Sequence, residues 1–519
     1  MGNETLEGGD GPVEGGKGPS RPPGSLAGTQ PSYSSRNRWG LLGGGGLFLL
    51  LLVVPPPPGL SPEGWRTAAV AILMAVWWMS EALPIPATAL LPLVLFPVLG
   101  ILDMGGAATP YANELIFLFM GGFFLAFAME RWNLHRRIAL TILGWVGEGP
   151  RALVLGFMVA SGFLSMWISN TATAAMMLPI AMAVGELFRP PHQEKDTGYS
   201  FGIALMLGIA YGASIGGVAT LIGTPPNAIM AGAAQELLGV EVGFLKWMIV
   251  GLPVAVILIP VAWALLVFVL YPPGELKGDG TAILARERRE MGAPSRGEWT
   301  VGAVFLLTAL AWVFREPKDL GAFAIPGLQS LAPAIRDSTI AMGAALLLFL
   351  IPVNWRRGIF ALDWATARRI PWGVLVLFGG GLSLARAMEQ SGLAAWIGAG
   401  VGAVGVVPSD LLAALVATLF IFLTEITSNT ATATMAMPVM AGVAVGLGAD
   451  PLTLMATAAM AASMAFMLPV ATPPNAIVFA SDYLSIPVMV KAGIWMNLIA
   501  IAVITAAVTL LIPHLVARV

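Results

Sequence analysis

Long apolar runs separated by short polar segments fill the chain from about position 39 to its end. Four of these runs carry no Asp, Glu, Lys or Arg over more residues than the roughly 18 that mark a membrane-spanning helix. They are residues 82–102, 152–185, 201–235 and 492–517. Counting all the apolar runs gives about eleven spanning helices. The pattern therefore predicts an all-α polytopic membrane protein.

The polar segments divide the chain into two halves. Residues 1–38 are rich in Gly, Pro and Ser without an apolar period, which is typical of a disordered tail. This tail is not expected to be a cleavable signal peptide, because its acidic residues precede the first apolar stretch. Residues 271–298 are the longest polar insertion and are predicted to be a cytoplasmic linker with a short amphipathic segment. The first half then covers residues 39–270, and the second half covers residues 299–519.

The two halves contain the same motifs in the same order. A Phe-x-Gly-Gly motif with a following Ala-Met-Glu occurs at 119–130 and again at 378–389. The sequence Ser-Asn-Thr-Ala-Thr-Ala occurs at 169–174 and again at 428–433. Both pairs are 259 residues apart (378 − 119 and 428 − 169). Ordered repeats in a membrane chain are typical of secondary transporters, whose substrate site lies where the two repeats meet.

A third motif pair has a shorter spacing. Thr-Pro-Pro-Asn-Ala-Ile occurs at 224–229 and at 472–477, which are 248 residues apart (472 − 224). The second half is therefore eleven residues shorter between its motifs (259 − 248). Because proline lacks the amide hydrogen that a continuing helix needs, both copies predict a break in a helix.

The length of the run at 152–185 excludes a single straight helix. It has 34 residues (185 − 152 + 1), and a helix of that length would extend about 51 Å, against a hydrocarbon core of about 30 Å. A break at Ser-Asn-Thr in the middle of the run, with one part entering as a re-entrant hairpin or a half-helix, resolves this conflict. Irregular backbone at membrane depth persists only where it is buried in protein or lines a cavity.

Both motifs also have purely structural interpretations. Ser and Thr in membrane helices often donate to carbonyls of their own helix or pack against neighbouring helices, and Pro-Pro can simply end a helix. Both motifs occur twice and in the same order, which favours a binding site built from the two halves.

Composition restricts what such a site can bind. The chain is 57% hydrophobic and only 11% charged, and it has no cysteine, which excludes disulfides and thiolate metal sites. The segments 152–185, 201–235 and 426–481 contain no Lys, Arg or His. Lys and Arg gather instead in loops such as 131–137 and 356–369, as expected of cytoplasmic connections. A bound anion would therefore be stabilised by helix N-termini and by sodium ions held by hydroxyl, amide and carbonyl oxygens.

The two Ser-Asn-Thr motifs, each followed by a Pro-Pro-Asn turn, resemble those of the divalent anion/sodium symporter family, which includes sodium-coupled dicarboxylate, citrate and sulfate carriers. The resemblance extends from about Trp39 to the C-terminus. It implies an inverted-repeat transporter with about eleven transmembrane helices and two re-entrant helical hairpins, divided into a scaffold domain and a transport domain. It also implies a homodimer in the lipid bilayer and an elevator-type movement.

By motif position, the resemblance also implies the residues of the site. The substrate would be bound by residues from both halves: Ser169, Asn170, Thr171, Thr224, Pro225, Ser428, Asn429, Thr430, Thr472 and Pro473. Two sodium ions would be bound, partly through backbone carbonyls, one around Ser165, Ser169, Asn170 and Gly223 and the other around Thr424, Thr427, Asn429 and Ala471. No catalytic residue, no organic cofactor and no nucleic-acid partner is implied.

The expected function is sodium-coupled symport of C4-type dicarboxylates such as succinate, fumarate and malate across the inner or plasma membrane. Dicarboxylate exchange and sodium-coupled transport of sulfate or citrate remain alternatives. Exchange would be favoured by a fixed cation at the hairpin tips, where the motifs carry none. An intramembrane enzyme is disfavoured because neither Ser-Asn-Thr is accompanied by His or Asp. An anion channel is disfavoured because a duplicated, enclosed site suits alternating access.

Overall fold

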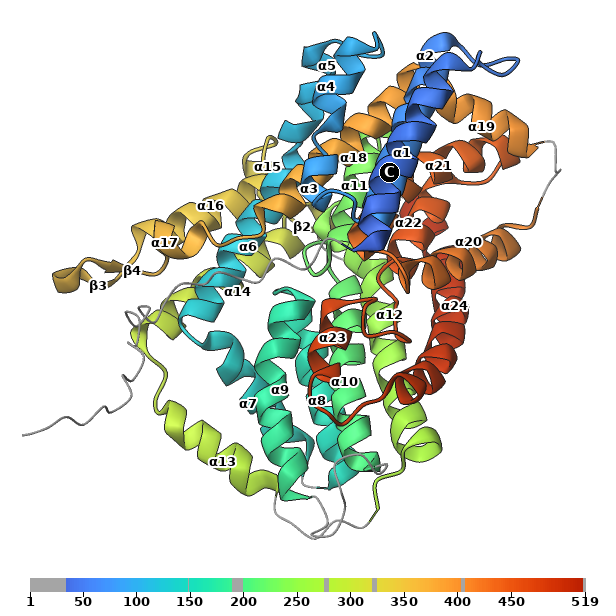
Figure 1. Ribbon diagram of the computed structural model, residues 1–519. Helices are drawn as coiled ribbons and strands as arrows, with labels where there is room; N and C mark the ends of the chain where they lie inside the picture. Colours follow the sequence, from blue (N-terminus) through green and yellow to red (C-terminus); the bar gives the residue numbers. More distant parts are fainter. Residues whose placement is uncertain are drawn as a thin grey trace, which may run out of the picture.

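The structure is a bundle of α-helices (Figure 1), as the hydrophobic pattern predicts. It is a computed structural model that describes residues 34–147, 149–188, 199–274, 280–319, 324–402 and 407–516. Strands in this part of the chain form two short antiparallel pairs: β1 (Lys318–Asp319) with β2 (Ala324–Ile325), and β3 (Pro352–Asn354) with β4 (Ile359–Phe360). The predicted all-α class is confirmed.

The first half holds the helices that carry the first copy of each motif. They are α1 (Ser35–Val53), α2 (Pro62–Ser80), α3 (Ile85–Thr88), α4 (Leu91–Val98), α5 (Met104–Ala108), η1 (Thr109–Ala112), α6 (Glu114–Arg131), α7 (Leu134–Val146), α8 (Pro150–Ser165), α9 (Asn170–Leu187), α10 (Ser200–Val218), α11 (Pro225–Leu238), α12 (Phe244–Ala264) and the π-helical turn η2 (Leu265–Leu270). Because α1 begins at Ser35, residues 35–38 of the segment that composition assigns to the tail are helical. Residues 1–33 of that segment lie outside the described residues.

The rest of the chain begins with a short connecting helix and continues with the second half. Its elements are α13 (Gly280–Met291), α14 (Arg296–Val313), α15 (Leu328–Leu331), α16 (Asp337–Leu350), η3 (Trp355–Arg357), α17 (Trp364–Ala367), α18 (Trp372–Gln390), α19 (Leu393–Gly402), α20 (Ser409–Thr424), α21 (Asn429–Leu447), α22 (Pro451–Ala461), α23 (Pro473–Phe479) and α24 (Ile486–Val516). Helix α13 lies in the predicted linker and is joined to α7 by an ion pair between Arg136 and Glu287. The linker is therefore tied to the first half.

Each Ser-Asn-Thr motif interrupts a helix. The first motif separates α8 from α9, and the second separates α20 from α21. Ser169 is the N-cap of α9, where its Oγ accepts a hydrogen bond of 3.2 Å from the Ala172 N–H. The predicted break in the run at 152–185 is confirmed.

Each Pro-Pro-Asn motif starts a new helix. The chain is non-helical at 219–224 between α10 and α11, and at 462–472 between α22 and α23. In both copies the prolines occupy the first two positions of the new helix, where their missing amide hydrogens remove no helical hydrogen bond. The predicted breaks are confirmed, and the second is longer, with eleven residues against six (472 − 462 + 1 and 224 − 219 + 1).

Helix α10 lies at the centre of the bundle. Every residue from Phe201 to Val218 is buried, and glycines allow α8 to approach it closely. A Cβ added to Gly216 would lie 2.1 Å from the carbonyl oxygen of Gly162 on α8. Any side chain at this position would push the two helices apart. Close packing of α8 on α10 therefore fixes the position of the first Ser-Asn-Thr.

Five helical stretches in the described part of the chain are long and apolar enough to cross a membrane: Met104–Arg131, Ser200–Val218, Phe244–Leu270, Asn429–Leu447 and Ile486–Pro513. Shorter apolar helices accompany them, among them α8, α16 and α20. The chain is thus a membrane protein with multiple apolar helices. The count of about eleven spans stays a prediction.

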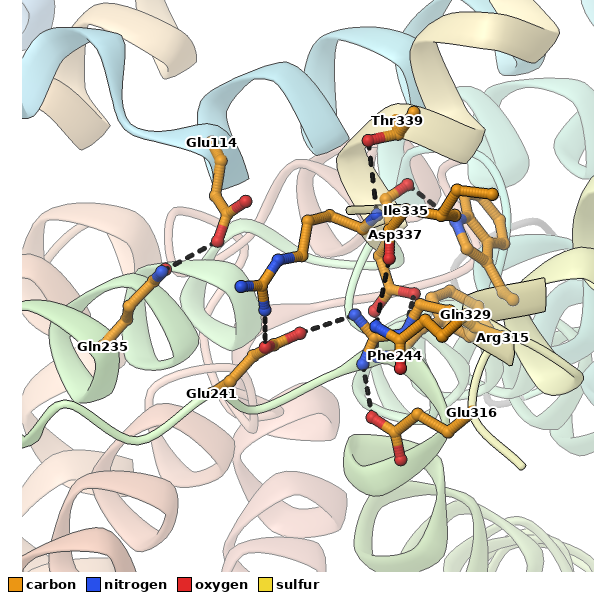
Figure 2. A network of polar contacts seen from close by, with 12 residues as sticks. Glu114, Gln235, Glu241, Phe244, Arg315, Glu316, Gln329, Ile335, Asp337 and Thr339 are labelled. Carbon is orange, nitrogen blue, oxygen red and sulfur yellow. Dashed lines mark hydrogen bonds and ion pairs between the residues drawn. The ribbon is translucent and has the colours of Figure 1, made fainter. Parts of the chain in front are cut away.

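A network of ion pairs ties the turn between α11 and α12 to the ends of α14 and α16 (Figure 2). The Arg315 side chain is only 4% exposed and lies 2.5 Å from both Glu241 and Glu316. It also lies 3.2 Å from Asp337, whose carboxylate accepts a hydrogen bond of 2.7 Å from the Phe244 N–H. Removing Arg315 would leave the buried Asp337 carboxylate uncompensated, so these contacts tie the three segments to one another.

Candidate substrate and sodium site

The two halves meet around one cavity of about 830 Å³ that both Ser-Asn-Thr motifs and both Pro-Pro-Asn motifs help to line. Helix α23 of the second half lies beside α9 and α10 of the first half (Figure 1). All ten residues predicted to bind substrate line this cavity: Ser169, Asn170, Thr171, Thr224, Pro225, Ser428, Asn429, Thr430, Thr472 and Pro473. Folding therefore brings together motifs that are about half the chain apart.

Most residues predicted to bind sodium line the same cavity. These are Ser169, Asn170, Gly223, Thr427, Asn429 and Ala471. The other two, Ser165 and Thr424, are fully buried at the ends of α8 and α20. Each hydroxyl lies at hydrogen-bond distance from the asparagine of the Ser-Asn-Thr motif in its own half. The two Ser-Asn-Thr motifs are called the first and the second tip.

At the first tip, Asn170 is held from behind by a buried hydroxyl. Its Oδ1 accepts a hydrogen bond of 2.5 Å from Ser165 Oγ, whereas its Nδ2 has no hydrogen-bond partner among the described residues. A Cβ added to Gly217 would lie 2.6 Å from Asn170 Oδ1. The missing side chain of Gly217 allows this close approach, so the last turn of α10 is packed directly on the tip.

The second tip has the same construction. Thr424 Oγ1 lies 2.7 Å from Asn429 Oδ1 and 2.8 Å from the Ala462 carbonyl oxygen, so two acceptors share its one hydrogen. The Nδ2 of Asn429 likewise has no partner among the described residues. The hydroxyl of Thr427 bonds to the adjoining ends of α20 and α21. Its Oγ1 donates to the Leu423 carbonyl at 2.8 Å and lies 2.6 Å from Thr432 Oγ1. The backbone carbonyl of Thr427 is therefore a further oxygen that could bind a cation, as expected for a site formed partly by carbonyls.

The released backbone between α10 and α11 lies against the first tip. A Cβ added to Gly223 would lie 2.4 Å from the Gly217 carbonyl oxygen and 2.9 Å from that of Ser165. Thr220 Oγ1 accepts from the Gly223 N–H at 3.1 Å and donates to the Met166 carbonyl at 2.5 Å. Several carbonyl oxygens thus converge beside Asn170, and such hard oxygen ligands suit sodium.

Three longer helices begin at the cavity. Helices α9, α11 and α21 start at Asn170, Pro225 and Asn429, which all line it. The N-terminus of a helix carries about half a positive charge and unpaired N–H groups. The cavity therefore favours an anion, although its motifs carry no basic residue.

One buried carboxylate beside the second tip was not predicted. Glu425 is 3% exposed and accepts hydrogen bonds of 2.8 to 3.1 Å from the backbone N–H groups of residues 466–468. It also accepts one of 2.9 Å from Asn497 Nδ2. The position 259 residues earlier is Met166. This departure from the repeat is the signal in the sequence that could have identified Glu425.

Charged residues from outside the motifs also line the cavity. Arg36 lies 3.5 Å from Glu81, Arg369 lies 3.7 Å from Glu130, and His135 is nearby in the lining. Both arginine side chains are more than half exposed, so water screens each ion pair. Each arginine is matched by an acid, and the two pairs add no net charge to the cavity.

Known proteins are similar in sequence to this chain over most of its length. The model of the sodium:sulfate symporter transmembrane region matches residues 36–516. The sodium-dependent dicarboxylate transporter SdcS of Staphylococcus saprophyticus is 43% identical over 460 residues, which cover 88% of this chain and 87% of that protein. SdcS of Staphylococcus aureus strain bovine RF122 is 43% identical over 464 residues, which cover 87% of this chain and 86% of that protein.

A solved structure has a similar fold. The YdaH transporter of Alcanivorax borkumensis matches with a TM-score of 0.56 over 79% of this chain and 87% of that one. The two sequences are 16% identical, so the similarity concerns the fold alone.

Proposed function

Because this chain belongs to the sodium:sulfate symporter family, we propose that it is a sodium-coupled dicarboxylate symporter of the plasma membrane. The observation that carries this proposal is the single cavity lined by the Ser-Asn-Thr and Pro-Pro-Asn motifs of both halves. Relatives that are 43% identical over most of the chain are named sodium-dependent dicarboxylate transporters, which supports this substrate class and this coupling ion. The proposed substrates are C4-type dicarboxylates such as succinate, fumarate and malate.

The proposed site binds a dianion with neutral donors. The Oδ1 atoms of Asn170 and Asn429 each face a buried hydroxyl, which leaves each Nδ2 to donate to one substrate carboxylate. The hydroxyls of the same tips and the N-termini of the helices that begin there add further donors. Thr224 and Thr472 form the wall between the two tips.

Two sodium ions would balance the two negative charges of the substrate. The first would be bound around Ser165, Ser169, Asn170 and Gly223, and the second around Thr424, Thr427, Asn429 and Ala471. In each half one asparagine would bind sodium through its oxygen and the substrate through its nitrogen. Since both ligands use one side chain, binding of one favours binding of the other, which is the physical requirement for coupling.

The charges at the cavity rim support an orientation. Arg36 lies at the start of α1, and Arg369 lies shortly before α18. Both residues line the cavity, and each lies in a short basic segment at the end of a helix. Since Lys and Arg are enriched in cytoplasmic loops, we place the open side of the cavity at the cytoplasm. The linker at 271–298, with its arginines, lies on the same side in this proposal.

In the proposed movement, the site moves relative to a group of helices that stays fixed in the membrane. Phe123 and Phe127 of α6 and Val374 of α18 line the cavity together with the motifs. We assign α6 and α18 to a scaffold domain, and the broken helices α8 to α11 and α20 to α23 to a transport domain that moves in an elevator-type cycle. The inverted repeat, with halves at 39–270 and 299–519, two re-entrant hairpins and a homodimer belong to the same proposal.

Uptake of labelled succinate into proteoliposomes tests this function. We expect uptake with an inward sodium gradient and none when choline or potassium replaces sodium. Uptake without sodium into vesicles preloaded with unlabelled dicarboxylate would instead support an exchanger. Sodium-driven uptake of sulfate or citrate but not of succinate would contradict the substrate class.

A further inference from the structure

Each half contains one buried asparagine that lies behind the cavity and has no role so far. Asn227 and Asn475 are the last residues of the two Thr-Pro-Pro-Asn motifs, and both are fully buried. We propose that they are positioning residues, whose side-chain amides hold the carbonyl oxygens of the broken helices in the arrangement that binds sodium. This inference rests on the proposed sodium-coupled function.

Asn227 bridges the start of the break between α10 and α11. Its Nδ2 donates to the Gly217 carbonyl at 3.0 Å and to the Thr220 carbonyl at 2.6 Å, with the Val218 carbonyl at 3.3 Å. Gly217 belongs to the last turn of α10, and Thr220 belongs to the released segment. One amide group therefore fixes the backbone on both sides of the point where the helix ends.

Asn475 makes the same bridge in the second half. Its Nδ2 donates to the Ala465 carbonyl at 3.1 Å and to the Leu468 carbonyl at 3.0 Å. These residues follow Gly217 and Thr220 by 248 positions (465 − 217 and 468 − 220), which is the spacing of the motifs. The helices α10 and α22 end at different points of the repeat, yet the asparagines bind equivalent carbonyls. The contacts of the two asparagines are therefore independent of the residue at which the preceding helix ends.

The carbonyl that Asn227 holds lies at the proposed first sodium site. A Cβ added to Gly223 would lie 2.4 Å from the Gly217 oxygen, and one added to Gly217 would lie 2.6 Å from Asn170 Oδ1. Gly217 thus lies between the side-chain amide of Asn227 and the two residues proposed to bind sodium, Asn170 and Gly223. Releasing it would allow the carbonyl and the tip asparagine to move apart.

The chemistry of the contact requires an asparagine. Two carbonyls need two N–H donors on one short, neutral side chain, which the carboxamide supplies. An ionised aspartate has the same shape but only acceptors. Within the described residues, the Oδ1 atoms of both asparagines have no hydrogen-bond partner. A buried polar atom without a partner is unfavourable. The favourable contacts of each asparagine are therefore those of its N–H donors.

Asn227→Ala and Asn475→Ala test the inference, with Ser383→Ala as a matched control. Ser383 is also fully buried, and its Oγ donates at 2.9 Å to the carbonyl of Ala107; neither residue lines the cavity. The sodium concentration that gives half-maximal thermal stabilisation is measured on purified protein without succinate, with choline as the reference salt. We expect this concentration to rise about tenfold in each asparagine variant, the effect of losing one hydrogen bond, and to stay unchanged in Ser383→Ala.

A second readout separates positioning from general stability. In proteoliposomes, the half-saturating sodium concentration for succinate uptake should rise in the asparagine variants, while KM for succinate at saturating sodium changes by less than about twofold. Equal losses of stability in both salts, with unchanged sodium half-saturation, would show a structural role only and overturn the inference.

Longer amides cover the case in which the alanine variants do not fold. Asn227→Gln and Asn475→Gln keep both donors but displace them, so sodium binding should weaken in these variants as well. Wild-type sodium half-saturation in the glutamine variants would count against the inference. A wild-type protein that does not respond to sodium would refute the proposed function itself, which keeps the two failures distinct.

Discussion

Replacing Asn170 or Asn429 with alanine removes one of two equivalent side chains from opposite ends of the proposed substrate. In both halves the Oδ1 atom lies at hydrogen-bond distance from a buried hydroxyl, at 2.5 Å from Ser165 and at 2.7 Å from Thr424. Both Nδ2 atoms are without a partner among the described residues, and both asparagines line the cavity. The two substitutions should therefore have the same effect.

The expected loss follows from the hydrogen bonds that disappear. A carboxylate that loses a charge-assisted donor loses about 1.5 to 3 kcal/mol, which is about ten- to over a hundredfold in affinity. Asn170→Asp and Asn429→Asp should be worse, because they keep an oxygen, remove the donor and add a negative charge beside the dianion. Thr224→Ala and Thr472→Ala should be milder, because water can replace a hydroxyl at the cavity wall.

Equilibrium binding of labelled succinate to purified protein in saturating sodium measures this loss. Thr418→Ala on α20 is a suitable control, because that hydroxyl donates only to the Ala414 carbonyl of its own helix, at 2.8 Å. The control should bind succinate normally. If either asparagine variant remains folded and binds succinate with wild-type affinity, the site is not built from both halves and the reasoning from the repeat is wrong.

Three other experiments examine stability and protonation. Glu425→Met introduces the residue that the first half has at this position and leaves one buried and two part-buried N–H groups without their acceptor, so it should cost about 1 to 3 kcal/mol for each buried group and lower the melting temperature, whereas Met166→Leu should not. Arg315→Met leaves the buried Asp337 carboxylate uncompensated and should destabilise the protein by about 3 to 5 kcal/mol, whereas Arg286→Met, at a highly exposed ion pair, should have little effect in the same melting assay. Succinate uptake should fall as pH drops from neutral, because carboxylates with a pKa not far above about 4 begin to bind protons and the dianion is depleted; uptake that rises on acidification would indicate a proton-coupled or monoanion carrier.

The helix breaks and the composition of the cavity wall could be predicted because their causes are local. The run at 152–185 is too long for one membrane span, and Pro225 and Pro473 cannot continue a preceding helix. Each break places a short polar motif at the end of a helix instead of on its lipid-facing side. Since the same motifs occur in both halves, the sequence also indicates which segments come together.

Side-chain directions and distant partners could not be predicted, because they depend on tertiary packing. The hydroxyl of Thr427 is turned toward Leu423 and Thr432 on the adjoining ends of α20 and α21, although its position in the sequence suits a sodium ligand. Arg36 and Arg369 reach the cavity from helix ends that lie far from the motifs in the sequence. Only the arrangement of the complete bundle brings them to the rim.

The breaks before the two Pro-Pro-Asn motifs differ in length and in the hydrogen bonds of their backbone. Only residues 448–450 separate α21 from α22, where the first half has positions 188–199, so the loop accounts for most of the shorter motif spacing. The break itself is nevertheless longer in the second half, and Glu425 accepts hydrogen bonds from three N–H groups at its centre, those of residues 466–468. Of these three positions, only the first corresponds to a helical residue of the first half, Val218 (466 − 248), and the side chain of Met166 has no oxygen to offer at the place of Glu425. A residue that departs from the repeat thus indicates where the two halves differ in backbone conformation.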